Sequence, residues 1–406
     1  MEKPNTLHLF TMSYPNGNSE SFVENEVNYL ALKFKKIYIY PSTGDSVQRN
    51  IPSNVTVMNL DSDKIKVSAL KVMLKNIGLV INVHFKELIH SSKKITYIKH
   101  LREFNSRLLK GIVIADKINT MSVNNDIFYS FWMNENALAL AVLKYRKKID
   151  HFVFRANGFD LYDVQAKYQY IPFRPFIFKQ ADKMFAVAKK GSDYMKSFNV
   201  CPEKITYSYF GTNDLGVSVF NPNEKFTIFT CSDLRKIKRV DAMVDILSFI
   251  KFPVKWIHHG NKGDNEKVFY EKLKQLSSNV EFILHERKEN YGDVLQFFKQ
   301  NHFNLFVLLS SIEGLPVSLI EAMSFGIPLL ATDVGGVSEV INENNGILIE
   351  CDFKPNQVAE KITQFLQSEK NTPTFRKKVR TDWENRFSAT KNYENFYLNL
   401  INYELS

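Results

Sequence analysis

The 406-residue chain has few cysteines and no long apolar run, and each shortage excludes a class of protein. Its three cysteines, Cys201, Cys231 and Cys351, are widely separated and odd in number, which argues against a disulfide framework or a cysteine metal site. The longest nearly uncharged apolar stretches, such as 77–85, are far shorter than the roughly 20 residues that span a bilayer. No apolar segment follows Lys3, so the sequence predicts no secretory signal, and we expect a cytoplasmic protein.

Acidic residues are scarce in the first half of the chain. Residues 1–205 carry 30 Lys and Arg against 18 Asp and Glu, a net charge of +12, whereas residues 206–406 carry a net charge of −2. The excess is strongest over 64–110, where eleven basic side chains stand with two acidic ones among apolar residues. This pattern is typical of basic helices that lie on the inner face of an anionic cell membrane and equally of solvated helices, so both interpretations stay open. No nucleic-acid motif accompanies the charge, and no nucleic-acid partner is predicted.

Short apolar runs alternate with amphipathic stretches of helical length in the second half of the chain, which predicts parallel α/β units. The expected strands are 226–231, 254–257, 280–284, 305–309 and 328–332, and the expected helices are 240–251, 266–276, 293–300, 317–325, 337–342, 355–367, 373–386 and 391–405. Near the start, strands 7–12 and 37–40 flank a loop and the helix 20–34, and strands are also expected at 183–188 and 205–209. The sequence thus predicts an α/β protein with two Rossmann-like domains, 1–205 and 206–385, a hinge at 211–224 and a terminal helix, 386–406, that returns to the first domain.

The most informative segment runs from Ser310 to Glu339. A buried strand ends at 309, the chain turns through Glu313 and Gly314, and a helix is expected to begin near Pro316, whose missing N–H suits a first helical turn. The free N–H groups and positive dipole end of such a helix favour an anionic diphosphate. Glu313 and Glu321 are suited to accept hydrogen bonds from sugar or ribose hydroxyls.

Residues 311–328, with Glu313 and Glu321 in a Glu-x7-Glu spacing, and residues 332–339 resemble glycosyltransferase family 4 (group 1), the retaining nucleotide-sugar-dependent enzymes of GT-B fold. Within this family, the chain resembles enzymes of bacterial surface-polysaccharide synthesis. The resemblance implies two Rossmann-like domains facing across a cleft, the C-terminal one holding a UDP- or GDP-sugar and the N-terminal one a glycan or lipid-linked acceptor. It implies a hexosyltransferase that needs no metal and no cofactor, because the nucleotide-sugar is a co-substrate. A sugar-nucleotide epimerase or hydrolase, or a non-catalytic nucleotide-sugar-binding protein, stays open as an alternative.

The resemblance also implies roles for single residues. In the turn 231–241, relatives carry an Arg and then a Lys on the donor diphosphate; Lys238 stands at the Lys place, and Arg235 is the nearest substitute for the Arg. Asn157 stands where many relatives place a His that contacts the donor sugar, which puts an acid/base role there in doubt. The candidate catalytic residues are Glu313, Lys238, Arg235 and Asn157, and the candidate donor-binding residues are Gly17, Lys238, Arg235, His285, Arg287, Glu313, Gly314, Leu315, Pro316, Val317, Ser318 and Glu321.

Three of these candidates rest on position in the predicted fold. Gly17 is the single glycine of the loop 13–22, which matches the place of a glycine-containing loop that lines the cleft in this family. His285 and Arg287 follow an expected strand at its carboxyl end, the edge where α/β sheets bind ligands. The Asp-x-Asp at 61–63 has the form of a metal-binding motif but is interpreted as a solvated turn, so no metal site is predicted.

Overall fold

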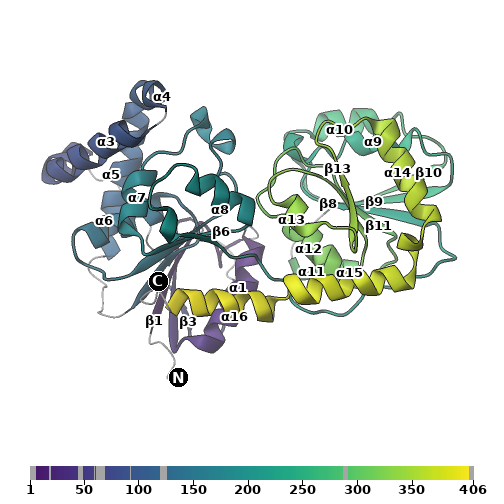
Figure 1. The fold of residues 1–406 in the computed structure, drawn as a ribbon, viewed down its shortest axis with the longest axis horizontal. Coiled ribbons are helices and arrows are strands. Elements are labelled where there is room, and N and C mark those ends of the chain that lie inside the picture. The colour runs from purple at the N-terminus through teal and green to yellow at the C-terminus, as the bar shows by residue number, and fades with distance from the viewer. Residues whose placement is uncertain are drawn as a thin grey trace. The chain divides into compact units, whose positions relative to one another are not determined.

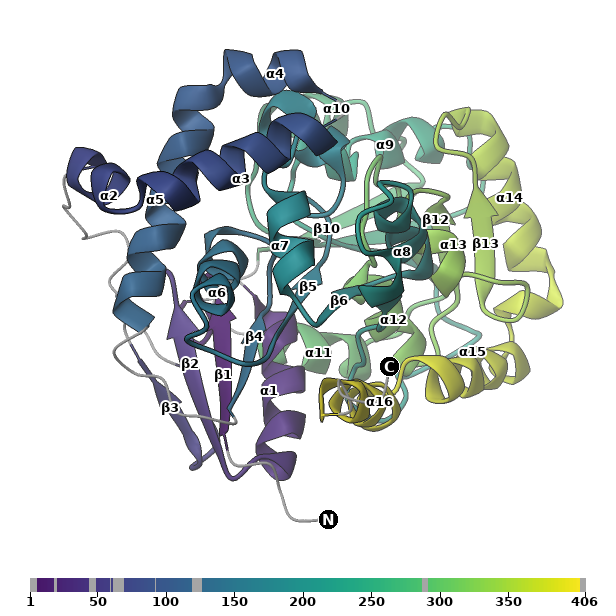
Figure 2. The same ribbon diagram turned by 60° about the vertical axis from the view of Figure 1, so that its left-hand side comes forward.

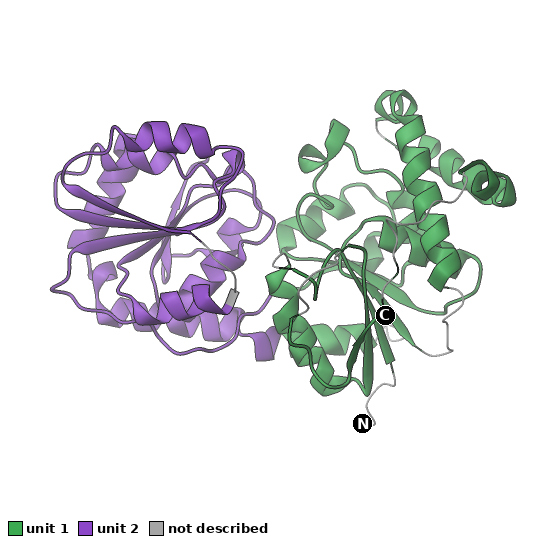
Figure 3. Cartoon of the chain, turned by 180° about the vertical axis from the view of Figure 1, so that it is seen from behind, with its two compact units in different colours: residues 1–209, 393–406 green, residues 210–392 purple. Residues whose placement is uncertain are grey.

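A computed structural model of the chain describes residues 6–17, 20–43, 49–58, 60, 69–91, 93–118, 126–286 and 291–401. The chain forms two compact units, shown in different colours in Figure 3. Unit 1 contains residues 1–209 and 393–406, and unit 2 contains residues 210–392. The boundaries expected from the sequence, after 205 and after 385, each precede these crossings by a few residues. None of the described helices is long and apolar enough to cross a membrane.

Unit 1 is built on a parallel sheet with the strand order β3-β2-β1-β4-β5-β6-β7. In the centre of the sheet, Leu7 pairs with Ile37 on one side and with Ile127 on the other. The inner strands are buried along nearly their whole length, as expected where helices cover both faces of a sheet (Figure 1). The strands are β1 (Thr6–Thr11), β2 (Lys36–Pro41), β3 (Val55–Val57), β4 (Ile127–Ser130), β5 (Phe152–Ala156), β6 (Lys183–Ala186) and β7 (Ile205–Tyr207).

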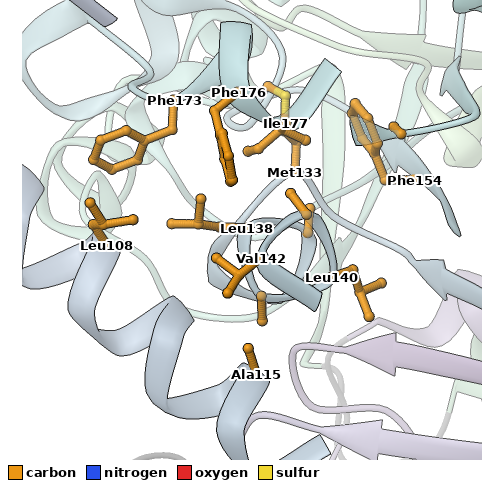
Figure 4. Close-up of a cluster of buried hydrophobic side chains, with 14 of the residues drawn as sticks. Leu108, Ala115, Met133, Leu138, Leu140, Val142, Phe154, Phe173, Phe176 and Ile177 are labelled. Atoms are coloured by element: carbon orange, nitrogen blue, oxygen red, sulfur yellow. The ribbon is translucent and has the colours of Figure 1, made fainter. Parts of the chain in front are cut away.

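The helices of unit 1 surround this sheet and supply most of its core. Figure 4 shows side chains of α5, α6 and α7 pointing toward one another, with Leu108, Leu138 and Phe176 among them. The helices are α1 (Ser21–Lys33), α2 (Ala69–Lys75), α3 (Ile77–His90), α4 (Lys94–Lys99), α5 (Leu101–Ile118), α6 (Glu135–Tyr145), α7 (Arg174–Gln180) and α8 (Lys189–Lys196), joined by most of α16 (Ala389–Ile401).

Unit 2 has a second parallel sheet, with the strand order β10-β9-β8-β11-β12-β13. Its strands are β8 (Phe226–Cys231), β9 (Val254–Gly260), β10 (Val280–Glu286), β11 (Leu305–Leu308), β12 (Leu329–Thr332) and β13 (Gly346–Ile349). Its helices are α9 (Ala242–Leu247), α10 (Glu266–Leu273), α11 (Tyr291–Gln300), α12 (Val317–Ser324), α13 (Val337–Val340), α14 (Pro355–Gln367) and α15 (Pro373–Arg386). All its strands run in parallel, so their carboxyl ends share one edge of the sheet.

The strands and helices expected in unit 2 are present, but several helices are shorter than expected, α10 among them, which ends at Leu273. The helix expected at 240–251 is α9, which ends at Leu247, and the helix expected at 337–342 is the single turn α13. Strand β13, which starts at a glycine and has four residues, was not expected. Two amides of the segment 211–224, which was expected to be a hinge, bond to unit 2: the Thr212 N–H donates to the Phe387 carbonyl (3.0 Å) and the Ser218 N–H to the Phe325 carbonyl (3.1 Å).

Candidate functional site

An ion pair lies at the carboxyl edge of the unit 2 sheet. Lys238 belongs to the 3-10 helix η5 (Lys236–Lys238) after β8, and Glu313 to the loop between β11 and α12. Because β8 and β11 are neighbours, the two side chains meet, and Lys238 Nζ lies 2.5 Å from Glu313 Oε1. The side chains are only 22% and 10% exposed, so solvent screens the pair weakly. The two residues that the sequence assigned to donor binding from separate segments are therefore brought together.

The neighbouring Arg239 fixes the turn that carries Lys238. Its guanidinium donates to the carbonyls of Leu309 (2.6 Å), Ser310 (3.2 Å) and Cys351 (2.9 Å). These contacts join the ends of three strands around the loop that contains Glu313. Sequence reasoning missed Arg239, because nothing in a run of basic residues separates a cation that holds carbonyls from one that faces solvent. We regard it as a positioning residue.

Two glycines after β12 hold the main chain of the Glu313 loop. Gly335 has a φ of +53°, and a Cβ at this position would lie 1.9 Å from the Glu313 carbonyl oxygen. The Gly336 N–H donates to the Gly314 carbonyl over 2.8 Å. Glycine alone accommodates both the left-handed backbone and this close approach. The structure thus identifies the Glu313 loop as the segment that this glycine pair approaches.

We expect Gly335→Ala to displace the Glu313 loop. The added methyl has no room beside the Glu313 carbonyl, so the variant should lose about 2–3 kcal/mol of unfolding free energy. Urea unfolding followed by circular dichroism measures this loss. Gly292→Ala is the matched control, since its added Cβ has no neighbour within 4 Å and should leave stability equal or slightly higher. Equal stability of the two variants would contradict the role of Gly335.

Helix α12 starts beside this loop, directly after Pro316. Its first bond runs from the Leu319 N–H to the Pro316 carbonyl, so the amides of Val317 and Ser318 belong to a first turn that lacks partners within the helix. Glu321 lies in the second turn and is only 4% exposed. The helix N-terminus and Glu313 are thus adjacent in the chain and held by the same glycine loop.

Three further candidates of unit 2 are Arg235, whose carbonyl accepts the Lys238 N–H (2.8 Å), His285 and Arg287. Arg235 is exposed and precedes η5. His285 lies at the end of β10, with its ring 4.6 Å from the ring of Phe297, and β9 separates its strand from β8. Arg287 and the Asp-x-Asp at 61–63 lie outside the described residues.

In unit 1, Asn157 directly follows β5 and is buried. Its N–H donates to Asp160 Oδ1 (2.9 Å) and its Nδ2 to the Phe131 carbonyl (3.2 Å), while its Oδ1 has no hydrogen-bond partner among the described residues. Asp160 also accepts the N–H groups of Met133 and Gly158. Burial raises the pKa of Asp160 to about 6. Asn157 is therefore held in a tight turn at the carboxyl edge of the unit 1 sheet.

The loop after β1, which contains Gly17, wraps around a carboxylate of the chain itself. The N–H groups of Met12 (3.1 Å), Ser13 (2.5 Å) and Tyr14 (2.7 Å) all donate to Glu20, and so does the indole N–H of Trp132. Successive amides of this kind make an anion-binding nest. In this chain the carboxylate of Glu20 fills the nest. The sequence did not reveal this role, because it predicted Glu20 to be part of the following helix. Glu20 instead adopts a left-handed conformation directly before α1.

Comparisons with known proteins show what the chain and its fold are similar to. Residues 217–382, which make up most of unit 2, match the family model "Glycosyl transferases group 1". An O-antigen biosynthesis glycosyltransferase of Escherichia coli is 34% identical over 130 residues, which are 32% of this chain and 35% of that protein. The match to this relative thus spans about a third of its length. An uncharacterized glycosyltransferase of Methanocaldococcus jannaschii is 24% identical over 70% of this chain and 78% of its own.

Solved structures place both units in one known fold. HepE of Anabaena, solved in complex with UDP, superimposes with a TM-score of 0.67 at 13% identity and covers 98% of this chain and 99% of its own. The lipopolysaccharide outer core galactosyltransferase WaaB superimposes with a TM-score of 0.68 at 16% identity and covers 98% of this chain and all of its own. The chain therefore has the GT-B fold, with two Rossmann-like domains, as the sequence predicted.

Proposed function

We propose that the chain is a retaining glycosyltransferase of family 4, which transfers a sugar from a nucleotide-sugar to an acceptor hydroxyl in surface-polysaccharide synthesis. The observation that carries the proposal is the Lys238–Glu313 pair beside the N-terminus of α12. A cation, free amides and a carboxylate at one sheet edge suit a ligand with a diphosphate and sugar hydroxyls. The UDP complexes of HepE and the O-antigen and capsule relatives support this choice.

In the proposed reaction, the bond between the anomeric carbon and the diphosphate oxygen breaks, and its electron pair leaves with the diphosphate. The acceptor oxygen bonds to the anomeric carbon on the same face, and its proton passes to the departing phosphate oxygen. Lys238 and the α12 amides stabilise the charge that develops on the leaving group, while Glu313 and Glu321 bind hydroxyls. Since the leaving-group charge is met by these groups, we propose that no metal is required, and activity in EDTA tests this.

The experiment for the donor is a panel of UDP- and GDP-sugars measured by thermal unfolding. A ligand at about 100 times its Kd stabilises the folded state by about 2.7 kcal/mol, a shift of several degrees. Product analysis by NMR then separates the functions: an α-glycoside on an acceptor supports transfer, whereas free sugar or an altered nucleotide-sugar would indicate a hydrolase or epimerase. Binding without any product would indicate a binding protein.

Glu321 is expected to contribute to donor affinity. Glu321→Gln keeps the shape of the side chain but removes its charge, and a hydrogen bond to a charged group is worth about 1.5–3 kcal/mol. We therefore expect the Kd for the donor to rise at least about tenfold by calorimetry. Glu343→Gln, an exposed site in the same unit, is the matched control. An unchanged donor Kd in the Glu321→Gln protein would remove Glu321 from the site.

We further propose that the acceptor is a glycan or lipid-linked oligosaccharide bound by unit 1. The polysaccharide-synthesis relatives support an acceptor of this class. A lipid-linked acceptor is presented at a membrane surface, so the enzyme would work at the cytoplasmic face of the membrane. Transfer to lipid-extracted acceptor, compared with transfer to the free glycan, tests which form is used.

A further inference from the structure

Helices α2, α3 and α4 and the first residue of α5 leave a series of large apolar side chains of unit 1 exposed. Ile81 and Phe85 of α3 are 61% and 62% exposed, and Ile95 of α4 is 85% exposed. In Figures 1 and 2, α3 and α4 project from the rest of unit 1. We name as the α3–α4 surface the exposed apolar residues of this region, which are Leu70, Leu74, Ile77, Ile81, Phe85, Leu88, Ile89, Ile95, Ile98 and Leu101.

Helix α3 is apolar on both of its sides. Its inner side buries Leu79, Val80 and Val83 in the core of unit 1. Ile77, Ile81 and Phe85 lie four residues apart, so they form a second stripe on the outer side. A helix on the surface of a globular protein has a polar outer face, and one that is apolar all round is covered by something else. At 14 residues, α3 is also too short to span a bilayer.

The charges around this surface are positive. Lys71, Lys75, Lys94, Lys99 and Arg102 are exposed between and beside the apolar side chains. The two acidic residues of 69–110 are both occupied elsewhere. Glu87 is buried and accepts the Tyr170 hydroxyl, and Glu103 accepts Lys167 (3.0 Å) and Tyr168. The surface therefore complements an apolar layer bordered by anions, and two copies facing each other would repel.

We propose that the α3–α4 surface binds the interface of an anionic lipid membrane, with its apolar side chains below the headgroups and its lysines on the lipid phosphates. Helices that lie in this plane combine buried apolar area with attraction to anionic lipid. Only the purpose of this binding rests on the proposed function, since it would bring unit 1 to a lipid-linked acceptor. Lipid binding itself involves no sugar substrate and is measured separately.

The test is co-sedimentation of the full chain with vesicles of equal parts phosphatidylcholine and phosphatidylglycerol, and with vesicles of phosphatidylcholine alone. We expect binding to the anionic vesicles and at least about tenfold weaker binding to the neutral ones. I81S/F85S should lower the partition coefficient about tenfold or more, because two exposed side chains no longer enter the lipid. K94E/K99E should lower the partition coefficient by a similar factor, but only with the anionic vesicles.

The matched control variants change residues that are similarly exposed but lie outside the α3–α4 surface. Leu32→Ser removes an apolar side chain that is 66% exposed on α1, and K377E/K378E reverses two exposed charges on α15, so both should bind as the wild type does. Circular dichroism establishes that each variant is folded. Absence of wild-type binding to anionic vesicles, or full binding by I81S/F85S, would overturn the proposal, as would a dimer that I81S/F85S dissociates. Stabilisation by the donor is measured on the same proteins without vesicles. A failure of the proposed function is therefore distinguishable from a failure of membrane binding.

Discussion

A Lys238→Ala variant is expected to transfer sugar about 10²–10³ times more slowly than the wild-type chain. The ammonium group is held 2.5 Å from Glu313, at the start of α12, where the departing diphosphate is proposed to lie. Removal of a fixed cation from a poorly screened site costs more in the transition state than in the ground state, because the leaving-group charge is largest there. The measurement is kcat and KM with the donor that the thermal panel identifies, and the loss should fall mainly on kcat.

Lys236→Ala is the matched control, because Lys236 lies in the same turn but is exposed. It should keep a kcat within about twofold of the wild type. Lys238→Arg retains the charge and should restore part of the lost rate, whereas Glu313→Ala should also depress chiefly turnover. Wild-type kcat in the Lys238→Ala protein, with the fold intact, would refute the assignment of the site.

Arg155→Met is expected to destabilise unit 1 by about 3–5 kcal/mol. Arg155 is fully buried and donates to Glu26 (3.1 Å), to the Tyr129 hydroxyl (2.9 Å) and to the Ser208 carbonyl (2.8 Å). Burial alone would lower the pKa of Arg155, but the Glu26 carboxylate and Tyr129 outweigh it and raise that pKa, so the side chain stays charged. Its guanidinium also packs 4.4 Å from the ring of Phe396 on α16.

The variant leaves the Glu26 carboxylate buried without its cation, so its unfolding midpoint should fall by about 10 °C in scanning calorimetry. The double variant E26L/R155M removes both charges and should be more stable than either single variant, which isolates the coupling between the two groups. If the loss of stability in the double variant equalled the sum of the losses in the two single variants, Glu26 and Arg155 would act independently. The buried pair would then have no special role.

The parts of the structure that the sequence predicted are those with a local signal. Strand β8 begins and ends at the predicted residues, because a run of apolar residues is bounded by polar ones. Helices α14 and α15 also have the predicted limits, because each begins at a proline. Strands β4 and β5 escaped prediction because segments of four or five residues without strict alternation do not separate a strand from a helix.

The meeting of Glu313 and Lys238 follows from two predicted strand ends at one sheet edge, together with the family resemblance. Arg239, Glu20 and the close approach of Gly335 to Glu313 depend instead on how separate loops pack. The partners of Arg239 and Gly335 lie twenty or more residues away, and Glu20 contacts the distant Trp132 as well as the nearby loop, so no spacing within the sequence encodes these contacts. The exposure of α3 is of the same kind: its apolar composition indicates burial on all sides, and only the fold shows which side is bare.

The three tryptophans of the chain are distributed in a way that makes one loop optically visible. Trp256 and Trp383 are fully buried in unit 2, whereas Trp132 is the one indole of unit 1 and donates to Glu20 at the loop after β1. A protein with W256F/W383F would therefore emit from a single indole next to the amide nest. Any ligand that displaced Glu20 from these amides would change the polarity around that indole, and titration fluorescence would report occupation of the unit 1 loop separately from donor binding in unit 2.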